Sequence, residues 1–252
     1  MAKTSTTRFS DRVENYVRYR PGYPREVLDL LRAECGLQSG HIVADIASGT
    51  GVFTRLLLEN GNSVFAVEPN TEMREMGIHE LESYPQLVSV AGTAEETTLR
   101  SASVDFVTAA QAAHWFDLPH ARAEFARILK PERWCVLIWN ERRTSSTPFL
   151  RDYEQLLLNY GTDYKEVRHE HTTAVIHEFF APAVYRERTF ELRQRFDSEG
   201  TAGRLLSSSY APLEGHQNHA PMMKELERIF RAHARDSVIE FEYNIRVFYG
   251  HL

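Results

Sequence analysis

The sequence predicts an α/β fold built on a doubly wound, mostly parallel sheet. Short apolar runs rich in β-branched residues alternate with amphipathic stretches, at the spacing of strand–helix–strand units. Within residues 25–140 these runs show no alternation of polar and apolar side chains, which is typical of parallel strands covered on both faces. The chain has 252 residues, 42% of them hydrophobic and 25% charged, and such a chain can bury a sizeable core.

The elements of the first half follow from periodicity and from the residues that end each run. The predicted strands cover 41–47, 62–70, 86–92, 103–113 and 134–140. The predicted helices between them cover 24–35, 53–61, 71–83 and 120–131. Pro24 suits a first helical turn, Gly61 suits a left-handed helix end, and Pro131 predicts the end of the last helix.

The second half has a different pattern. Amphipathic helices are predicted over 149–161 and 219–236, and strands that alternate apolar and polar residues over 185–197 and 238–252. Alternation indicates antiparallel strands near a sheet edge. We therefore expect one domain, 1–252, divided into an arm, a core, a helical insertion and closing strands and helices: 1–24, 25–140, 141–184 and 185–252.

Composition excludes several classes of protein. The net charge of −6 disfavours a nucleic-acid partner held by bulk electrostatics, and no apolar run approaches the roughly 20 residues of a membrane span. The N-terminus has no apolar signal region, and the two cysteines, Cys35 and Cys135, cannot form a disulfide framework. A cytoplasmic protein is expected, and the sequence carries no signal for an oligomeric state.

Charge is unevenly distributed. Residues 1–25 carry six basic and two acidic side chains, a charge of +4, which leaves −10 on the remainder. The arm is either an element that handles anions or a solvated segment.

A glycine-containing turn lies between the first predicted strand and its helix, with the sequence Asp45-Ile46-Ala47-Ser48-Gly49-Thr50-Gly51. Ligands of open α/β sheets bind at such carboxyl ends of strands. Glu68 ends the second strand, where a carboxylate accepts hydrogen bonds from ribose hydroxyls. Thr54 stands where the dinucleotide fingerprint has its last glycine, so the NAD pattern is incomplete.

Several motifs together carry a family resemblance. They are D-I-A-S-G-T-G, A-V-E-P-N, G-T-A-E-E-T-T-L, A-A-Q-A-A-H-W-F-D, the early Y-R-P-G-Y-P, the late G-R-L-L-S-S-S-Y-A-P and the terminal Y-N-I-R-V-F-Y-G-H-L. In this order and spacing, over nearly the whole chain, they resemble the class I S-adenosylmethionine-dependent methyltransferases, and in particular the type 11 methyltransferases of small molecules. The resemblance implies a seven-stranded Rossmann-like sheet with an antiparallel last strand, S-adenosylmethionine as cofactor, and a small-molecule acceptor.

The resemblance also implies a role for each matching residue. Asp45 would orient the turn near the methionine amine, above a floor of Ala47, Ser48, Gly49 and Gly51. Glu68 would bind the ribose, Gln111 would lie near the methionine end, and the adenine would contact Pro69, Met73, Thr93, Ala94 and Glu95. The family usually has glycine at the position of Ala47, and a methyl group there penalises positive φ by roughly 1–2 kcal/mol.

The segment before Y-R-P-G-Y-P covers the cofactor in the resembled family, so residues 1–24 are expected to form a lid. Tyr16 and Arg20 would then face the cofactor, and Arg20 would pair with a carboxylate of the cofactor or of an acidic substrate, or remain solvated.

On the acceptor side, His114 is the candidate general base, because its ordinary pKa lies near neutrality. The alternative is that His114-Trp115-Phe116 is a packing corner that forms a wall of the pocket. The other candidate substrate contacts are Tyr19, Trp115, Trp139 and Tyr210.

Three functions compete at this point. The leading hypothesis is methyl transfer to a small molecule, either a carboxylic acid or a hydroxyl compound. The rivals are an NAD(P)-dependent oxidoreductase and a non-catalytic scaffold of the same fold, with Ala47 as a mark of decay. His169, His171 and His177 lack the further spaced ligands of a metal site, so no metal is expected.

Overall fold

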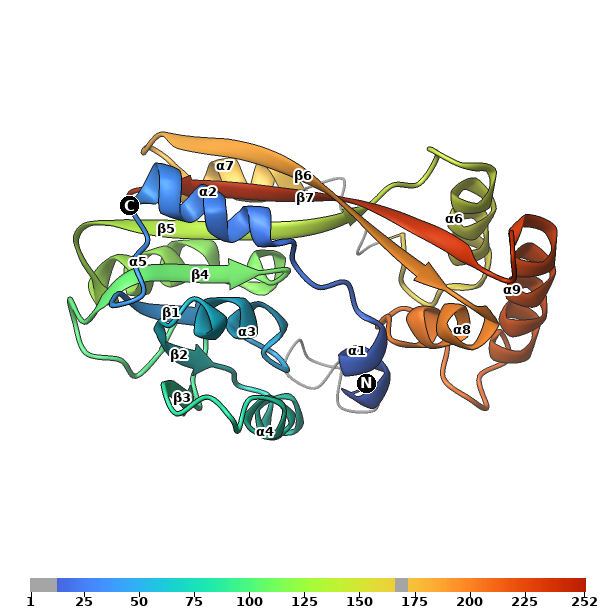
Figure 1. Cartoon of the computed structure of the whole chain (residues 1–252), viewed down its shortest axis with the longest axis horizontal. Helices are drawn as coiled ribbons and strands as arrows, with labels where there is room; N and C mark the ends of the chain where they lie inside the picture. Colours follow the sequence, from blue (N-terminus) through green and yellow to red (C-terminus); the bar gives the residue numbers. More distant parts are fainter. Residues whose placement is uncertain (1–12, 166–171) are drawn as a thin grey trace.

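The computed structural model describes residues 13–165 and 172–252. In this part of the chain, a seven-stranded sheet has the order β3-β2-β1-β4-β5-β7-β6 (Figure 1). The strands are β1 (Ile42–Ile46), β2 (Ser63–Val67), β3 (Leu87–Val90), β4 (Val104–Ala110), β5 (Leu129–Arg142), β6 (Tyr185–Phe196) and β7 (Ile239–Gly250). Strands β1 to β5 are parallel, whereas β7 is antiparallel to both of its neighbours. The predicted doubly wound sheet with an antiparallel last strand is confirmed.

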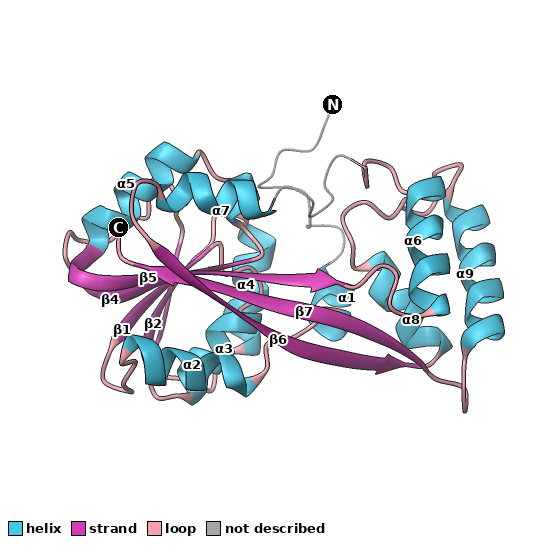
Figure 2. Cartoon of the chain, turned by 90° about the horizontal axis from the view of Figure 1, so that it is seen from above, coloured by secondary structure: helices cyan, strands magenta, loops and turns pink. Residues whose placement is uncertain are grey.

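Helices cover both faces of this sheet. The α-helices of the described residues are α1 (Val13–Tyr19), α2 (Arg25–Cys35), α3 (Val52–Glu59), α4 (Thr71–Glu80), α5 (Leu118–Ile128), α6 (Pro148–Tyr160), α7 (Thr172–Phe180), α8 (Ser198–Leu206) and α9 (His219–His233). Figure 2 shows α2 and α3 on one face and α5 and α7 on the other. In β5, Val136 and Ile138 belong to the first hydrophobic cluster, and Cys135 and Leu137 to the second. Burial on both faces explains the uninterrupted apolar runs.

Local side chains fix where several helices begin. The side chains of Asn70, Thr147 and Asp197 each accept a backbone N–H of the first turn that follows, in α4, α6 and α8. Helix α3 instead starts from Gly51, whose φ of 82° is left-handed. These caps place the starts of α3 and α4 at the carboxyl ends of β1 and β2.

The strand predicted over 103–113 was too long. Strand β4 ends at Ala110, Gln111 has a positive φ of 58°, and Ala113–Trp115 form a short 3₁₀ helix. The alanines on either side of Gln111 are compatible with strand or turn, so the apolar pattern alone extended the strand too far.

The helix predicted to end at Pro131 ends earlier, and the following strand starts earlier. Helix α5 ends at Ile128 and β5 begins at Leu129. The pairing with β4 shifts register here, since Val104 pairs with Leu129 but Phe106 with Trp134. Pro131 has no backbone N–H to donate, and at this irregularity of the ladder none is required, so the proline is accommodated within the strand.

Three helices extend beyond the carboxyl end of the central strands, where Figures 1 and 2 show α6, α8 and α9 grouped at one end of the sheet. Helices α1, α7 and α8 were not predicted. Helix α1 packs against α8 and touches α4, so it connects this helical end with the first half of the chain. No helix in the described part of the chain has the length and apolar character to cross a membrane.

Candidate functional site

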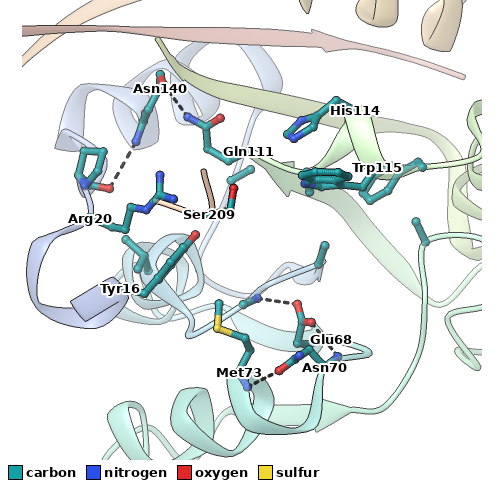
Figure 3. Close-up of a pocket in the computed structure, with 18 of the residues that line it drawn as sticks. Tyr16, Arg20, Glu68, Asn70, Met73, Gln111, His114, Trp115, Asn140 and Ser209 are labelled. Atoms are coloured by element: carbon teal, nitrogen blue, oxygen red, sulfur yellow. Dashed lines mark hydrogen bonds between the residues drawn. The ribbon is translucent and has the colours of Figure 1, made fainter. Parts of the chain in front are cut away.

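A cavity of about 460 Å³ opens at the carboxyl ends of the parallel strands, a size typical of small-molecule sites. Its walls come from the segments after β1, β2, β3 and β4, from the end of β5, from the start of α4, and from α1, α8 and the segment after α8. Figure 3 shows Glu68, Asn70 and Met73 on one side, with Arg20, Tyr16 and Ser209 across the cavity from His114 and Trp115. This is the position expected for the ligand of an open α/β sheet.

The glycine turn after β1 forms part of this wall through Ala47 and Gly49. Gly49 has a φ of 60°, and a Cβ there would lie 3.3 Å from Met73 Cε. A Cβ on Gly51 would lie 2.4 Å from Leu81 Cδ1, so glycine leaves room for the residue that follows α4. Ala47 has a φ of 54°, so the alanine occupies a backbone conformation that favours glycine.

Replacing Ala47 by glycine should stabilise the fold. Relief of the left-handed alanine is worth about 1–2 kcal/mol, and the greater freedom of glycine in the unfolded chain offsets about 0.5–1 kcal/mol of this. We expect Ala47→Gly to raise the melting temperature of the ligand-free protein by about 1–4 °C. Ala123→Gly, at an exposed position inside α5, is the control and should lower it. A lower melting temperature for Ala47→Gly would contradict the proposed strain.

Glu68 lies directly after β2 and is 7% exposed. Its Oε2 accepts the backbone N–H of Gly49 and its Oε1 accepts that of Asn70, each at 2.9 Å. A carboxylate has about four acceptor positions, so both oxygens keep capacity for a ligand's hydroxyl groups. Burial raises the pKa of Glu68 above its usual range, although the two backbone hydrogen bonds act in the opposite direction.

Asp45 lies beneath the turn and does not line the cavity; it is 1% exposed. Its two carboxylate oxygens accept hydrogen bonds from Thr54 Oγ1 at 2.6 Å and Thr108 Oγ1 at 2.8 Å. Burial raises the pKa of Asp45 to about 6. The side chain thus connects β1 with α3 and β4 immediately below the turn.

The residues predicted to contact adenine lie together at the Glu68 side of the cavity. Pro69, Met73, Thr93, Ala94 and Glu95 all line it. Glu95 Oε1 accepts the backbone N–H of Asp117 at 2.9 Å, which connects this segment to the start of α5.

Gln111 and Asn140 connect the ends of two strands to the N-terminal segment. Gln111 Nε2 donates to the backbone oxygen of Asn140 at 2.7 Å. Asn140 Nδ2 donates to the backbone oxygens of Pro21 and Gly22 at 3.4 and 3.3 Å (Figure 3). The Y-R-P-G-Y-P segment is therefore fixed at the carboxyl end of β5, with Tyr16 and Arg20 in the cavity wall.

The aromatic corner after β4 is part of the cavity wall. His114 is exposed, and its ring centroid lies 4.5 Å from that of Trp115. Trp139 instead belongs to the core, with 1% exposure, because neighbouring residues of a strand face opposite sides. Tyr19 is also buried, against α8, where a Cβ on Gly203 would lie 2.1 Å from its ring.

Most of the predicted site residues thus meet in one cavity, and five do not. The residues that line it are Tyr16, Arg20, Ala47, Gly49, Glu68, Pro69, Met73, Thr93, Ala94, Glu95, Gln111, His114, Trp115 and Tyr210. Those absent from its lining are Tyr19, Asp45, Ser48, Gly51 and Trp139.

Sequence reasoning missed a basic wall of the cavity. Arg142 and Arg204 line it, together with Tyr164 and Ser209. Arg142 is neutralised, because its Nη2 lies 2.5 Å from Glu154 Oε2. Arg204 lies in the G-R-L-L-S-S-S-Y-A-P segment, which contributes to the family resemblance. The spacing of residues in that segment gives no indication that this arginine reaches the cavity.

No group of three or more potential metal ligands is present among residues 13–165 and 172–252. His169 and His171 lie outside the described residues. His177 lies in α7 and is exposed.

Residues 44–137 match the family model of the type 11 methyltransferase domain. An uncharacterized methyltransferase of Mycobacterium tuberculosis (strain H37Rv) is 42% identical over 134 residues, which are 53% of this chain and 52% of that protein. An uncharacterized methyltransferase-like protein of Schizosaccharomyces pombe is 31% identical over 62% of this chain and 59% of that protein. The matched part spans little more than half the length of these curated relatives.

The likeness in fold extends further along the chain. A candidate type II methyltransferase from Anaeromyxobacter dehalogenans superposes with a TM-score of 0.69, covering 92% of this chain and 98% of that chain at 22% identity. A candidate methyltransferase from an antibiotic biosynthesis pathway of Anabaena variabilis gives a TM-score of 0.66, covering 94% and 100% at 22% identity. At this identity the likeness concerns the fold.

Proposed function

We propose that this chain, which belongs to the class I S-adenosylmethionine-dependent methyltransferases of the type 11 family, transfers the methyl group of S-adenosylmethionine to a small-molecule acceptor. The observation that carries the proposal is Glu68, a buried carboxylate that faces the cavity beside the glycine turn after β1. The expected acceptor is a carboxylic acid or a hydroxyl compound. We also propose that the protein is cytoplasmic and that it has no nucleic-acid partner.

The donor set of the cavity fits this cofactor. Glu68 retains acceptor capacity for the two ribose hydroxyls, and Gly49 leaves room beside Met73 that a side chain would fill. Glu95 would accept from the adenine amine, and Ala94 would contact the ring. Gln111 and Arg20 would face the methionine end, where a guanidinium matches a carboxylate.

When bound, S-adenosylmethionine supplies a methyl group whose bond to sulfur breaks with its electron pair on sulfur, as the acceptor's lone pair forms the new bond. The chain would contribute mainly position and exclusion of water. Asn140 holds Pro21 and Gly22 at the rim, which supports a covering role for residues 13–24, the described part of the N-terminal arm. An acceptor hydroxyl must also lose its proton, and His114 is the proposed base for that case, because it lines the cavity and is exposed to solvent.

Calorimetric titration separates the rival functions. We expect S-adenosylhomocysteine and sinefungin to bind in the micromolar range and NADH not to bind. Binding of NADH in place of both analogues would favour the oxidoreductase. Failure of all three to bind would favour the non-catalytic scaffold.

A further inference from the structure

The basic wall of the cavity contains one cation with an unusual environment. Arg204, in α8, is 4% exposed and lines the cavity. Within residues 13–165 and 172–252, no carboxylate forms an ion pair with it. A buried cation without a countercharge is expensive to maintain. An anion brought by a ligand would neutralise it.

The guanidinium is held in place by neutral groups. Its Nε donates to Tyr243 Oη at 3.0 Å, and its Nη1 donates to Ser208 Oγ at 3.1 Å and to Ser207 Oγ at 3.4 Å. No described residue accepts a hydrogen bond from Nη2. Nε and Nη1 are therefore positioned by the protein, and the N–H groups of Nη2 remain for a partner.

A second guanidinium lies near the first. Arg20 Nη2 donates to the backbone oxygen of Ser207 at 3.1 Å, so Arg20 and Arg204 are held by the same residue. Burial, and then repulsion from Arg204, lower the pKa of Arg20. The acidic side chains that line the cavity lie elsewhere: Glu68 and Glu95 toward the glycine turn, and Glu141 in an ion pair with Arg246 at 3.0 Å. The α8 side of the cavity is therefore cationic.

We propose that Arg204 binds a carboxylate of the methyl acceptor, so that the substrates of this site are small organic acids. This inference rests on the proposed methyl transfer and selects the acid from the two acceptor classes. The N–H groups of a guanidinium nitrogen form stronger hydrogen bonds to a charged carboxylate oxygen than to a neutral hydroxyl. Tyr210 and Ser209 also line the cavity, and hydroxyl groups such as theirs suit the remaining carboxylate lone pairs. Arg20, which lines the same cavity, is the residue proposed for the carboxylate of the cofactor.

The test measures binding, not turnover. The protein is first saturated with S-adenosylhomocysteine and then titrated in a calorimeter with matched pairs: octanoate and octanamide, benzoate and benzamide, succinate and succinamide, with inorganic phosphate as a further anion. We expect at least one acid to bind tenfold or more tightly than its amide. In Arg204→Gln this preference should disappear, while the affinity for S-adenosylhomocysteine changes less than twofold. Arg193→Gln removes an exposed arginine that pairs with Glu240 outside the cavity, and it should change neither quantity.

Each contrary outcome has a distinct meaning. If no acid binds better than its amide to the wild-type protein, or if phosphate binds as tightly as the best acid, the proposal is wrong, whether or not the variant folds. If Arg204→Gln weakens S-adenosylhomocysteine instead, Arg204 serves the cofactor's carboxylate and the proposal also fails. Failure of S-adenosylhomocysteine to bind the wild-type protein contradicts the proposed function before any acid is added.

Discussion

Glu68→Ala should weaken S-adenosylhomocysteine by roughly 1.5–3 kcal/mol, which is about 10- to 150-fold in Kd. The carboxylate is 7% exposed and already oriented by the N–H groups of Gly49 and Asn70, so ribose hydroxyls would meet a fixed acceptor. Hydrogen bonds to a charged acceptor in such an environment are among the stronger ones. Isothermal titration of the variant and the wild type measures the difference directly.

The same substitution leaves two backbone N–H groups without their acceptor, so it can also disturb the turn itself. A ligand that lacks the ribose hydroxyls distinguishes the loss of a direct contact from such a structural effect. The 2′,3′-dideoxy analogue of S-adenosylhomocysteine lacks both hydroxyls and should bind wild type and Glu68→Ala with nearly equal affinity. Glu75→Ala removes an exposed acid of α4 and is the matched control for charge. Equal losses for both ligands in Glu68→Ala would mean that Glu68 supports the turn and does not bind the ribose.

The central sheet could be predicted because its signals are local. Runs buried on both faces, such as 42–46 and 135–140, lie between glycines, prolines and polar turns, and each run is one strand. The glycine turn and Glu68 occupy fixed positions relative to those strands. Their convergence on one cavity therefore follows once the strands are parallel and adjacent.

The α8 side of the site could not be predicted in the same way, because tertiary contacts decide it. Helix α8 contains Gly200 and Gly203, which weaken helix propensity, yet Gly203 is the residue that admits the Tyr19 ring. The beginning of β5 is a second such case, because Asp105 on the neighbouring strand forms ion pairs with Lys130 at 3.0 Å and Arg133 at 3.4 Å, on either side of Pro131. Arg204 and Arg20 are far apart in sequence, and both donate to Ser207. The periodicity of apolar residues does not predict contacts between residues so far apart in the sequence.

Asp45 should make the stability of the ligand-free protein depend on pH in an unusual direction. Its folded pKa of about 6, raised by burial, lies above the ordinary value of 3.8. The folded state therefore holds this proton more tightly than the unfolded state. Its contribution to stability is present below about pH 4 and is lost as pH rises through about 6. A pKa difference of about two units corresponds to roughly 2–3 kcal/mol, opposite in sign to the contribution of most paired carboxylates.

Asp45→Asn isolates this contribution from those of the other acids. We expect the wild type to gain roughly 2–3 kcal/mol in the free energy of unfolding relative to the variant between pH 7 and pH 4, measured by urea denaturation at each pH. The exposed Glu96→Gln is the matched control, and its difference from wild type should stay nearly constant over this range. A constant difference for Asp45→Asn would contradict the raised pKa.

A cation beside a buried carboxylate lowers its pKa. If the ammonium group of S-adenosylhomocysteine lies near Asp45, saturation with this ligand should therefore abolish most of the pH dependence in the wild type.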